Sequence, residues 1–358
     1  MIQLHSYIYY FLTIAGSFVV SVYTVRKIIF ITTKRKIFDI PDNIRKIHGA
    51  EIPSLGGIGI FIGYIVIAAF FMFTDHSRWN YILISSVILF FTGIYDDIMN
   101  MRPLKKLLAQ LIASAITIYF TVMPAIYADA APPGANMPMY VAIITVLTIG
   151  CTFFINAFNF IDGIDGLACV LAILYTLILG ILYASGGQLS TAAIIFSLSG
   201  ATMGLLYYNK APAKIYMGDT GSMLLGFNIF IFSILCPFIT HTADIKIVDD
   251  SSGLILLSVL FLPAYDAIRV FLLRISKGIS PLKADRTHLH YYLLDAGFSH
   301  SRSVFIITAT NILIISLSFF LWHLNILFVL LIYTVIASTI LYIIYRLRQK
   351  NLLKAGTG

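Results

Sequence analysis

The sequence predicts an all-α, polytopic integral membrane protein, built as a single domain over residues 1–358 with about eleven transmembrane helices. Hydrophobic residues make up 59% of the chain and charged residues only 11%, whereas soluble domains carry roughly 25% charged residues. Apolar runs of about 20 residues, the length that crosses a bilayer core of ~30 Å, recur along the chain. A soluble protein with a large core would instead show amphipathic periodicity.

The expected spans are near-continuous apolar runs that end where polar residues resume, as at "TTKRK" after the first and "YDD" after the third. Glycine, proline and charged residues mark other connections, such as "NKAPAKIYMGDTGS" before the eighth. Two or three of the runs are short for a bilayer. The expected spans cover residues 7–29, 55–74, 80–95, 106–123, 139–155, 167–185, 190–207, 222–241, 253–275, 303–321 and 326–345.

The connections between these spans alternate in charge. Every other connection is rich in lysine and arginine, and the connections between them, such as "ADAAPPGANMP", are poor in both. Of the 24 lysines and arginines, only Arg78 and Lys246 fall in this second, basic-poor set. The positive-inside rule places the basic set in the cytoplasm, with the N-terminus outside and the C-terminus cytoplasmic. The net charge of +8 then reflects loops that face anionic lipid and a phosphorylated ligand, so no nucleic-acid partner is expected.

Polar side chains from four separate regions gather on this predicted cytoplasmic face. Carboxylates end the third span, fill the connection between the fifth and sixth, and precede the eighth, and two histidines lie in the largest cytoplasmic loop. Ionisable groups placed against lipid are costly and usually functional. These residues are Asp96, Asp97, Asp162, Asp165, Asp219, His288 and His290.

The motif "YDD" places Asp96 and Asp97 side by side at the end of a helix. Taken alone, the pair can be a solvated loop that marks where a span stops. Adjacent carboxylates repel one another, however, and a bound cation relieves that conflict. Because Mg²⁺ prefers oxygen ligands, the pair is a candidate metal site.

The segment "NAFNFIDGIDGLA" gathers two carboxylates and two carboxamides between two apolar spans. Asp162 and Asp165 are three residues apart, as are Asn156 and Asn159, so each pair lies on one side of a helix or tight turn. An EF-hand loop would space its acidic residues by two and close with a glutamate, where this chain has Ile173. A calcium loop is therefore excluded.

Two further motifs offer groups that bind cations or anions. "YMGDTGS" places Asp219 between glycines and hydroxyls at the start of a helix, as a simple N-cap or as a metal or anion site. "DRTHLHYYL" supplies Arg286, His288 and His290. Zinc would need a further clustered ligand, so these side chains fit phosphate oxygens better, together with the lysines of "RPLKK".

These motifs together resemble the polyprenyl-phosphate N-acetylhexosamine-1-phosphate transferase family. "YDD", "NAFNFIDGIDGLA", "YMGDTGS" and "SPLKADRTHLHYYLLDAGFS" occur in that family's order and loops, and the resemblance runs from "IPDNIRKIHGAEIPSLGG" to the last spans. The histidine loop is similar to that of the undecaprenyl-phosphate GlcNAc-1-phosphate transferases, not to the "HHHFE" loop of the phospho-MurNAc-pentapeptide branch. One departure is Tyr291, where the GlcNAc branch usually has a further histidine.

The resemblance implies a phosphotransferase of the bacterial inner membrane. It would transfer N-acetylhexosamine 1-phosphate, most simply GlcNAc-1-phosphate, from a UDP-sugar to undecaprenyl phosphate and release UMP. This is the first membrane step of cell-envelope polysaccharide synthesis, and its active site would face the cytoplasm. A homodimer is compatible with the sequence.

The resemblance also implies roles for the acidic residues and their neighbours. Asp219 and Asn159 are expected to bind Mg²⁺, which Mn²⁺ can replace, with Asp97 nearby as a further ligand. Asp96, Asp97 and Asp162 form the expected catalytic set. Asp96 would orient or deprotonate the lipid phosphate, and Asp162 would hold its loop or approach the nucleotide.

The remaining expected residues bind substrate. Asp165 would meet the uracil ring, and basic side chains would clamp the diphosphate. The expected substrate-binding set is Lys106, Asn156, Asp165, Arg286, His288 and His290.

Two alternatives compete with this hypothesis, one from another class of protein and one from the same family. A transporter or flippase for a lipid-linked sugar would place ionisable residues near the middle of the bilayer, whereas here they gather at one surface. The same reaction with phospho-MurNAc-pentapeptide is the alternative within the family.

Transfer can proceed through a covalent intermediate on Asp96 or by direct attack. We expect direct attack, because a phosphate monoester with a pKa of ~6 is already largely ionised at pH 7.

Overall fold

The computed structural model describes residues 2–35, 52–72, 78–130, 136–239, 246–280 and 286–356. Its regular elements within these ranges are helices, α1 to α13, and one π-helical turn, η1. Their bounds are α1 Ile2–Arg35, α2 Gly57–Met72, α3 Arg78–Met99, α4 Pro103–Thr117, η1 Ile118–Val122, α5 Met123–Ala130, α6 Met137–Ile161, α7 Leu167–Ser185, α8 Leu189–Asn209, α9 Gly218–Ile239, α10 Lys246–Ser276, α11 Leu289–Asp295, α12 His300–Leu321 and α13 Ile326–Gly356.

The all-α, polytopic membrane class is confirmed. Ten helices of the described part of the chain are long and apolar enough to cross a membrane, and α2 is a shorter apolar helix at the position of the expected second span. Helices persist through these runs because a backbone in lipid must satisfy its own hydrogen bonds. The fourth expected span is one path through α4, η1 and α5, with the π-helical turn in its middle.

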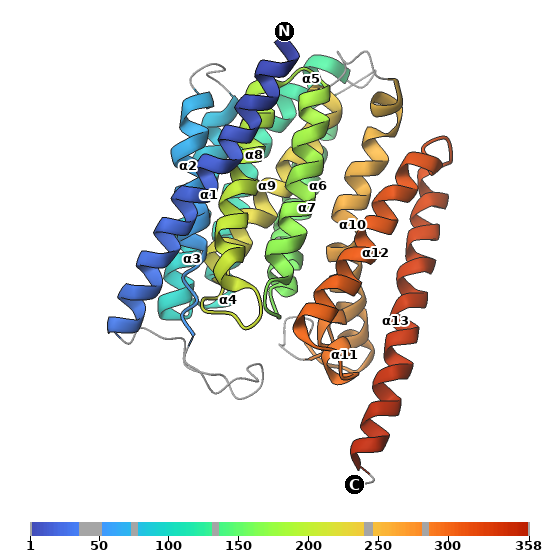
Figure 1. Ribbon diagram of the computed structural model, residues 1–358. Coiled ribbons are helices and arrows are strands. Elements are labelled where there is room, and N and C mark those ends of the chain that lie inside the picture. The colour runs from blue at the N-terminus through green and yellow to red at the C-terminus, as the bar shows by residue number, and fades with distance from the viewer. Residues whose placement is uncertain are drawn as a thin grey trace.

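Helix α9 occupies the middle of the bundle (Figure 1). It packs against α3 and α6 along its length, and also against α2, α7 and α10. Within its apolar window 83% of residues are buried, compared with 17% for α1 and for α13. Asp219 lies at the N-terminal end of this central helix, with its side chain 27% exposed.

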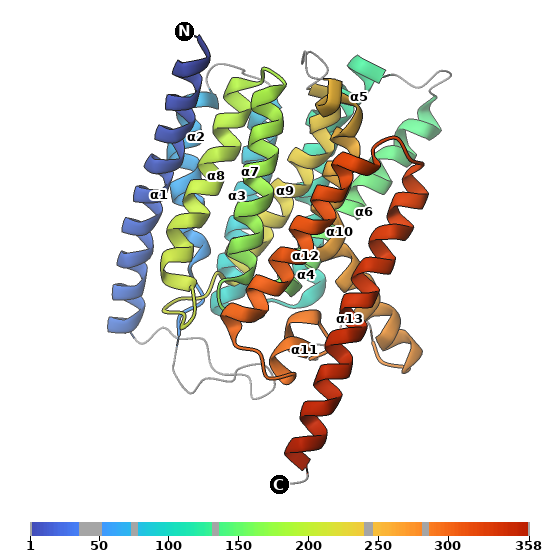
Figure 2. The ribbon, with the colours of Figure 1, turned by 45° about the vertical axis from the view of Figure 1, so that its right-hand side comes forward.

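Two sets of helices lie on either side of the central ones. α1, α2 and α8 pack together on one side, and α10, α12 and α13 form the other side (Figures 1 and 2). The start of α4, the connection after α6 and the short helix α11 lie at the same end of the bundle, where the C-terminus also lies (Figure 2). Residues far apart in sequence are thereby brought to one end.

The N-terminus and C-terminus lie at opposite ends of the bundle (Figure 1). This arrangement agrees with an odd number of spans, and the assignment of the C-terminal end to the cytoplasm stays a prediction. Some sequence predictions fall outside the described residues: the start of the resemblance at residues 40–51, the ends of the second and eighth spans, and residues 281–285 of the histidine loop.

Candidate active site

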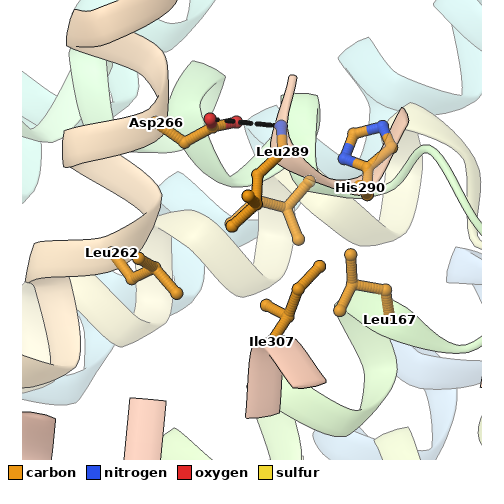
Figure 3. Close-up of a pocket in the computed structure, with 7 residues that line it drawn as sticks. Leu167, Leu262, Asp266, Leu289, His290 and Ile307 are labelled. Carbon is orange, nitrogen blue, oxygen red and sulfur yellow. Dashed lines mark hydrogen bonds between the residues drawn. The ribbon is translucent and has the colours of Figure 1, made fainter. Parts of the chain in front are cut away.

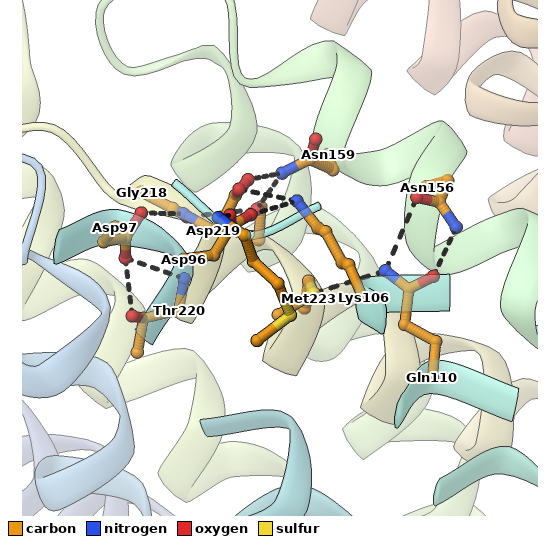
Figure 4. A network of polar contacts seen from close by, with 12 residues as sticks. Asp96, Asp97, Lys106, Gln110, Asn156, Asn159, Gly218, Asp219, Thr220 and Met223 are labelled. Carbon is orange, nitrogen blue, oxygen red and sulfur yellow. Dashed lines mark hydrogen bonds and ion pairs between the residues drawn. The ribbon is translucent and has the colours of Figure 1, made fainter. Parts of the chain in front are cut away.

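The start of α9 is held by a carboxylate from α3. Asp97 accepts hydrogen bonds from the backbone N–H groups of Asp219, at 2.7 Å, and Thr220, at 3.0 Å, and from the Thr220 hydroxyl at 2.6 Å (Figure 4). Free N–H groups at a helix start attract negative charge. Gly218 has a φ of +72°, and a Cβ there would lie 2.7 Å from an Asp97 oxygen, so only glycine fits this turn.

Lys106, near the start of α4, links Asp219 to the end of α3. The ammonium of Lys106 lies 2.5 Å from Asp219 Oδ2 and 2.9 Å from Asp96 Oδ2 (Figure 4). Asn159 of α6 donates from its amide to Asp219 Oδ1, and also to the hydroxyl of Ser222 at 2.7 Å. Four helices thus converge on Asp219, and we call Asp96, Asp97, Lys106, Asn159 and Asp219 the acidic centre.

A second polar layer lies one helical turn further into the bundle. Asn156 donates to Gln110 Oε1 at 2.6 Å, and Gln110 donates to the sulfur of Met223 at 3.2 Å (Figure 4). Gln110 follows Lys106 by one turn of α4, and Asn156 precedes Asn159 by one turn of α6. The pair therefore fixes the spacing between the two helices that carry Lys106 and Asn159.

The acidic centre has the donor chemistry that Mg²⁺ requires. Its ligand atoms are carboxylate and amide oxygens, and Mg²⁺ is commonly held by one or two carboxylates, with waters and substrate phosphates completing six positions. Within the described ranges, groups of three histidine, cysteine or acidic side chains arranged for a metal are absent. Asp219 and Asn159 could supply this smaller set, although Asp219 here accepts from Asn159 and Lys106. Both Asp97 oxygens accept bonds from α9. The ligand roles of Asp219, Asn159 and Asp97 all stay predictions.

The connection between α6 and α7 carries the two other aspartates. Asp165 Oδ2 accepts the backbone N–H of Ala213 at 3.1 Å and lies 3.4 Å from Nδ1 of His300. Removal of Asp162 from water, with the negative charges of Asp219 and Asp165 nearby, raises the pKa of Asp162 to about 7. Asp162 is thus close enough to the acidic centre to feel its charge.

The histidine segment is anchored on α10. His288 Nδ1 lies 2.9 Å from Asp266 Oδ2, and the backbone N–H of Leu289 donates to Asp266 Oδ1 at 3.2 Å. Arg269 pairs with Asp266 at 2.7 Å and donates to the carbonyl of Thr287 at 2.6 Å. Asp266 and Arg269 therefore fix the start of α11 and the orientation of the His288 ring.

His290 reaches the loop between α6 and α7. A Cβ added at Gly163 would lie 2.1 Å from His290 Nε2, so the imidazole packs directly on that glycine. Burial and the neighbouring His288 lower the pKa of His290 to about 3, so the ring is neutral near pH 7. The ring borders a small cavity lined with apolar side chains and Asp266 (Figure 3). His290 can therefore serve as a hydrogen-bonding group but not as a cation.

The structure brings most of the predicted residues into two neighbouring regions, the acidic centre with the loop after α6, and the histidine segment. Asp96, Asp97, Lys106, Asn159 and Asp219 form the acidic centre, and Asp162 and Asp165 lie in the adjoining loop. His288 and His290 stack nearly parallel, with ring centroids 5.8 Å apart. Arg286 pairs with Asp295 of α11, and Asn156 pairs with Gln110.

Sequence reasoning missed residues that hold these groups in place. Gln110 was detectable as an amide inside an apolar run, one turn after Lys106. Asn209 accepts the backbone N–H of Gly166 at 3.1 Å and donates to the carbonyl of Ile215 at 2.9 Å. Asp295 and His300 gave no local signal, because their partners are distant in sequence.

Comparisons with known proteins agree with the motifs. The sequence profile of glycosyl transferase family 4 matches residues 79–237. The chain is 32% identical over 306 residues to a probable undecaprenyl-phosphate N-acetylglucosaminyl 1-phosphate transferase of Bacillus subtilis, covering 82% of this chain and 81% of that protein.

Two further similar proteins come from other species. The chain is 28% identical to a decaprenyl-phosphate N-acetylglucosaminephosphotransferase of Mycobacterium tuberculosis, covering 74% of this chain and 70% of that protein. It is also 28% identical to an undecaprenyl-phosphate alpha-N-acetylglucosaminyl 1-phosphate transferase of Escherichia coli, covering 77% and 74% respectively.

Proposed function

Because the chain belongs to glycosyl transferase family 4, with its polyprenyl-phosphate N-acetylglucosamine-1-phosphate transferases, we propose that it transfers GlcNAc-1-phosphate from UDP-GlcNAc to undecaprenyl phosphate. The products are undecaprenyl-diphospho-GlcNAc and UMP. The product would start a cell-envelope polysaccharide at the cytoplasmic face of the inner membrane.

One observation supports this proposal above the others. The acidic centre places Asp219, Lys106 and Asp96 in contact at the end of the bundle where α11 also lies. A reaction between a soluble sugar nucleotide and a lipid phosphate needs such charged groups where helices leave the membrane. Phosphoryl transfer depends on positioning and charge neutralisation more than on covalent chemistry by the protein.

The proposed reaction breaks one bond and forms one. An oxygen of the lipid phosphate attacks the β-phosphorus of UDP-GlcNAc, and the bond from that phosphorus to the bridging oxygen breaks. The bridging oxygen and its electron pair leave with UMP. A proton still on the lipid phosphate passes to Asp96, whose Oδ1 accepts the backbone N–H of Met101 at 2.6 Å.

The residues have distinct proposed roles. Asp219 and Asn159 hold Mg²⁺, which when bound neutralises charge on the diphosphate. Lys106 lies between the two carboxylates, where its ammonium can turn to a phosphate oxygen. His288 and His290 bind the diphosphate from the other side, with His290 as a neutral group.

The proposal is tested with purified protein, undecaprenyl phosphate and a panel of UDP-sugars that includes UDP-MurNAc-pentapeptide. We expect UMP release with UDP-GlcNAc only when the lipid is present. Release with UDP-MurNAc-pentapeptide alone would move the chain to the peptidoglycan branch. A lack of lipid-dependent UMP release with every sugar would contradict the proposal.

The cytoplasmic position of the site is tested by labelling introduced cysteines. Ser280 is exposed after α10, and Met137 is 73% exposed at the opposite end of α6; Ala131 lies outside the described residues. The native cysteines Cys151 and Cys236 are buried, as is the third, and add little background. An impermeant reagent should label Met137→Cys in intact cells and Ser280→Cys only after permeabilisation. The reverse pattern would contradict the assignment.

Direct attack and a covalent intermediate are separated by isotope exchange. Enzyme freed of lipid is given UDP-GlcNAc, Mg²⁺ and labelled UMP. Direct attack predicts that label enters UDP-GlcNAc only after undecaprenyl phosphate is added. Rapid exchange without lipid, abolished by Asp96→Asn, would establish the covalent route.

A further inference from the structure

The C-terminal end of α13 contacts the histidine segment. Asp295, the last residue of α11, accepts from Arg348 Nε at 3.0 Å through Oδ2, while its Oδ1 accepts from Arg286 at 3.0 Å. Asn351 donates to the Asp295 backbone carbonyl at 3.0 Å. One carboxylate thus links an expected substrate-binding arginine to the final helix.

Aromatic contacts strengthen this junction. The guanidinium of Arg348 lies 4.5 Å from the ring centroid of Tyr292, and that of Arg269 lies 5.5 Å from it. Both distances are within the range of cation–π attraction. Tyr345 packs near Tyr292 at 6.3 Å between centroids. Tyr345, Arg348 and Asn351 recur at every third residue, so α13 presents one face to α11.

Helix α11 is consequently held at both ends. Asp266 and Arg269 of α10 fix its first residues, as described above. Arg348 and Asn351 of α13 fix its last residue, Asp295. With only 7 residues, α11 is too short to be stable by itself, so its position depends on these two anchors.

We propose that Arg348 and Asn351 are positioning residues for the sugar-nucleotide site, acting through Asp295. They hold α11 so that Arg286, His288 and His290 face the diphosphate of the UDP-sugar. The last turns of α13 are therefore part of the substrate site without touching substrate. This inference rests on the proposed function.

The first test is a kinetic comparison of substitutions on one helix. Arg348→Ala should raise the KM for UDP-GlcNAc about three- to tenfold, the size expected for losing an ion pair and a cation–π contact. The KM for undecaprenyl phosphate and kcat should stay within about twofold. Asp295→Asn should act in the same direction, and Arg348→Lys should recover part of the loss.

Arg346→Ala is the matched control. Arg346 lies two residues away on the exposed side of α13, with its guanidinium over Tyr342 of the same helix. We expect its kinetics to equal those of the wild type. A purely structural role for Arg348 would reduce the amount of active enzyme and leave both KM values unchanged, and that result would overturn the proposal.

A second measurement does not depend on the reaction. Hydrogen exchange at the amides of residues 289–295 should become faster in Arg348→Ala, and not in Arg346→Ala, with substrate absent. Unchanged protection would overturn the proposal even if KM shifted. If the wild type releases no UMP, the proposed function fails, while this measurement still decides whether α13 holds α11.

Discussion

Four carboxylates lie around the start of α9 with one lysine that pairs with two of them, whereas two carboxylates around α11 pair with three arginines. The first group consists of Asp96, Asp97, Asp162 and Asp219 with Lys106. With every carboxylate counted as ionised, its formal charge is −3, from four negative charges and one positive charge. Such a site lacks positive charge and favours a divalent cation.

The second group has the opposite balance. Asp266 and Asp295 pair with Arg269, Arg286 and Arg348, which leaves a formal charge of +1. The two groups approach one another where His290 packs on Gly163. From this difference we propose a division of labour, in which the acidic centre would bind the metal and stabilise the reacting phosphates, and the histidine segment would orient the nucleotide. Substitutions in the first should lower kcat, and those in the second should raise KM.

Removal of the metal should have the largest effect. Exhaustive dialysis against EDTA should abolish UMP release, because charge on the transferring phosphate is then no longer neutralised. Added Mg²⁺ should restore activity, and Mn²⁺ should restore part of it. Full activity in the dialysed enzyme would refute the charge argument for the acidic centre.

Asp219→Asn should have the second largest effect. We expect it to lower kcat at least ~10²-fold, the order expected when a principal charge stabiliser is lost. Asparagine keeps the shape and leaves the Asp97 bonds to α9 in place. Thr145→Ala, an exposed site on α6, serves as the control for handling in detergent. A correctly folded Asp219→Asn enzyme with a near-wild-type rate would show that the metal site lies elsewhere.

Asp266→Asn should act on binding. Loss of the charged partner of His288 should raise the KM for UDP-GlcNAc about tenfold, as expected for one hydrogen bond to a charged group. The kcat should change less than in Asp219→Asn. If Asp266→Asn lowered kcat and left KM unchanged, the division of labour between the two groups would be wrong.

Gln110→Leu should give the smallest effect. It removes the hydrogen bond between Asn156 and Gln110, while the Asn156 amide still donates to the Thr152 carbonyl at 2.8 Å. The free energy of unfolding should fall by about 1 kcal/mol, measured by thermal unfolding in detergent. The kcat should fall only a few-fold, because Lys106 and Asn159 lose support but keep their own contacts. In Gln110→Leu/Asn156→Leu the two losses should not add, and additive losses would contradict the pairing.

The fold was largely predictable from the sequence because an apolar run that crosses lipid must satisfy its own backbone hydrogen bonds, and a helix does so. All eleven expected spans coincide with helices, and the spacing of three residues placed Asn156 and Asn159 on one helix. The π-helical turn η1 was not predicted, because "IYFTV" does not differ in composition from its flanks.

The candidate site was predictable in its residues and not in its contacts. Lys106 and Asp219 are 113 residues apart, and their pairing depends on how α4 and α9 pack. Asn159 contacts Asp219, whereas Asn156 contacts Gln110. The spacing of three residues does not predict these partners, because they depend on how the helices pack. Arg348 looked like an ordinary basic residue of a tail, because its partner Asp295 is 53 residues away.

The capping of α9 by Asp97 has a consequence for biogenesis. Asp97 leaves the ribosome 122 residues before Asp219, a delay of about 6–24 s at ~5–20 residues per second. During that interval α3 and α4 are already made, so Lys106 can neutralise Asp96 within the nascent chain. The hydrogen-bond donors of Asp97 belong to Asp219 and Thr220, so Asp97 has no bond from α9 until that helix is made. The arrival of α9 is therefore the step that completes the acidic centre, before α10 and α11 add the histidine segment.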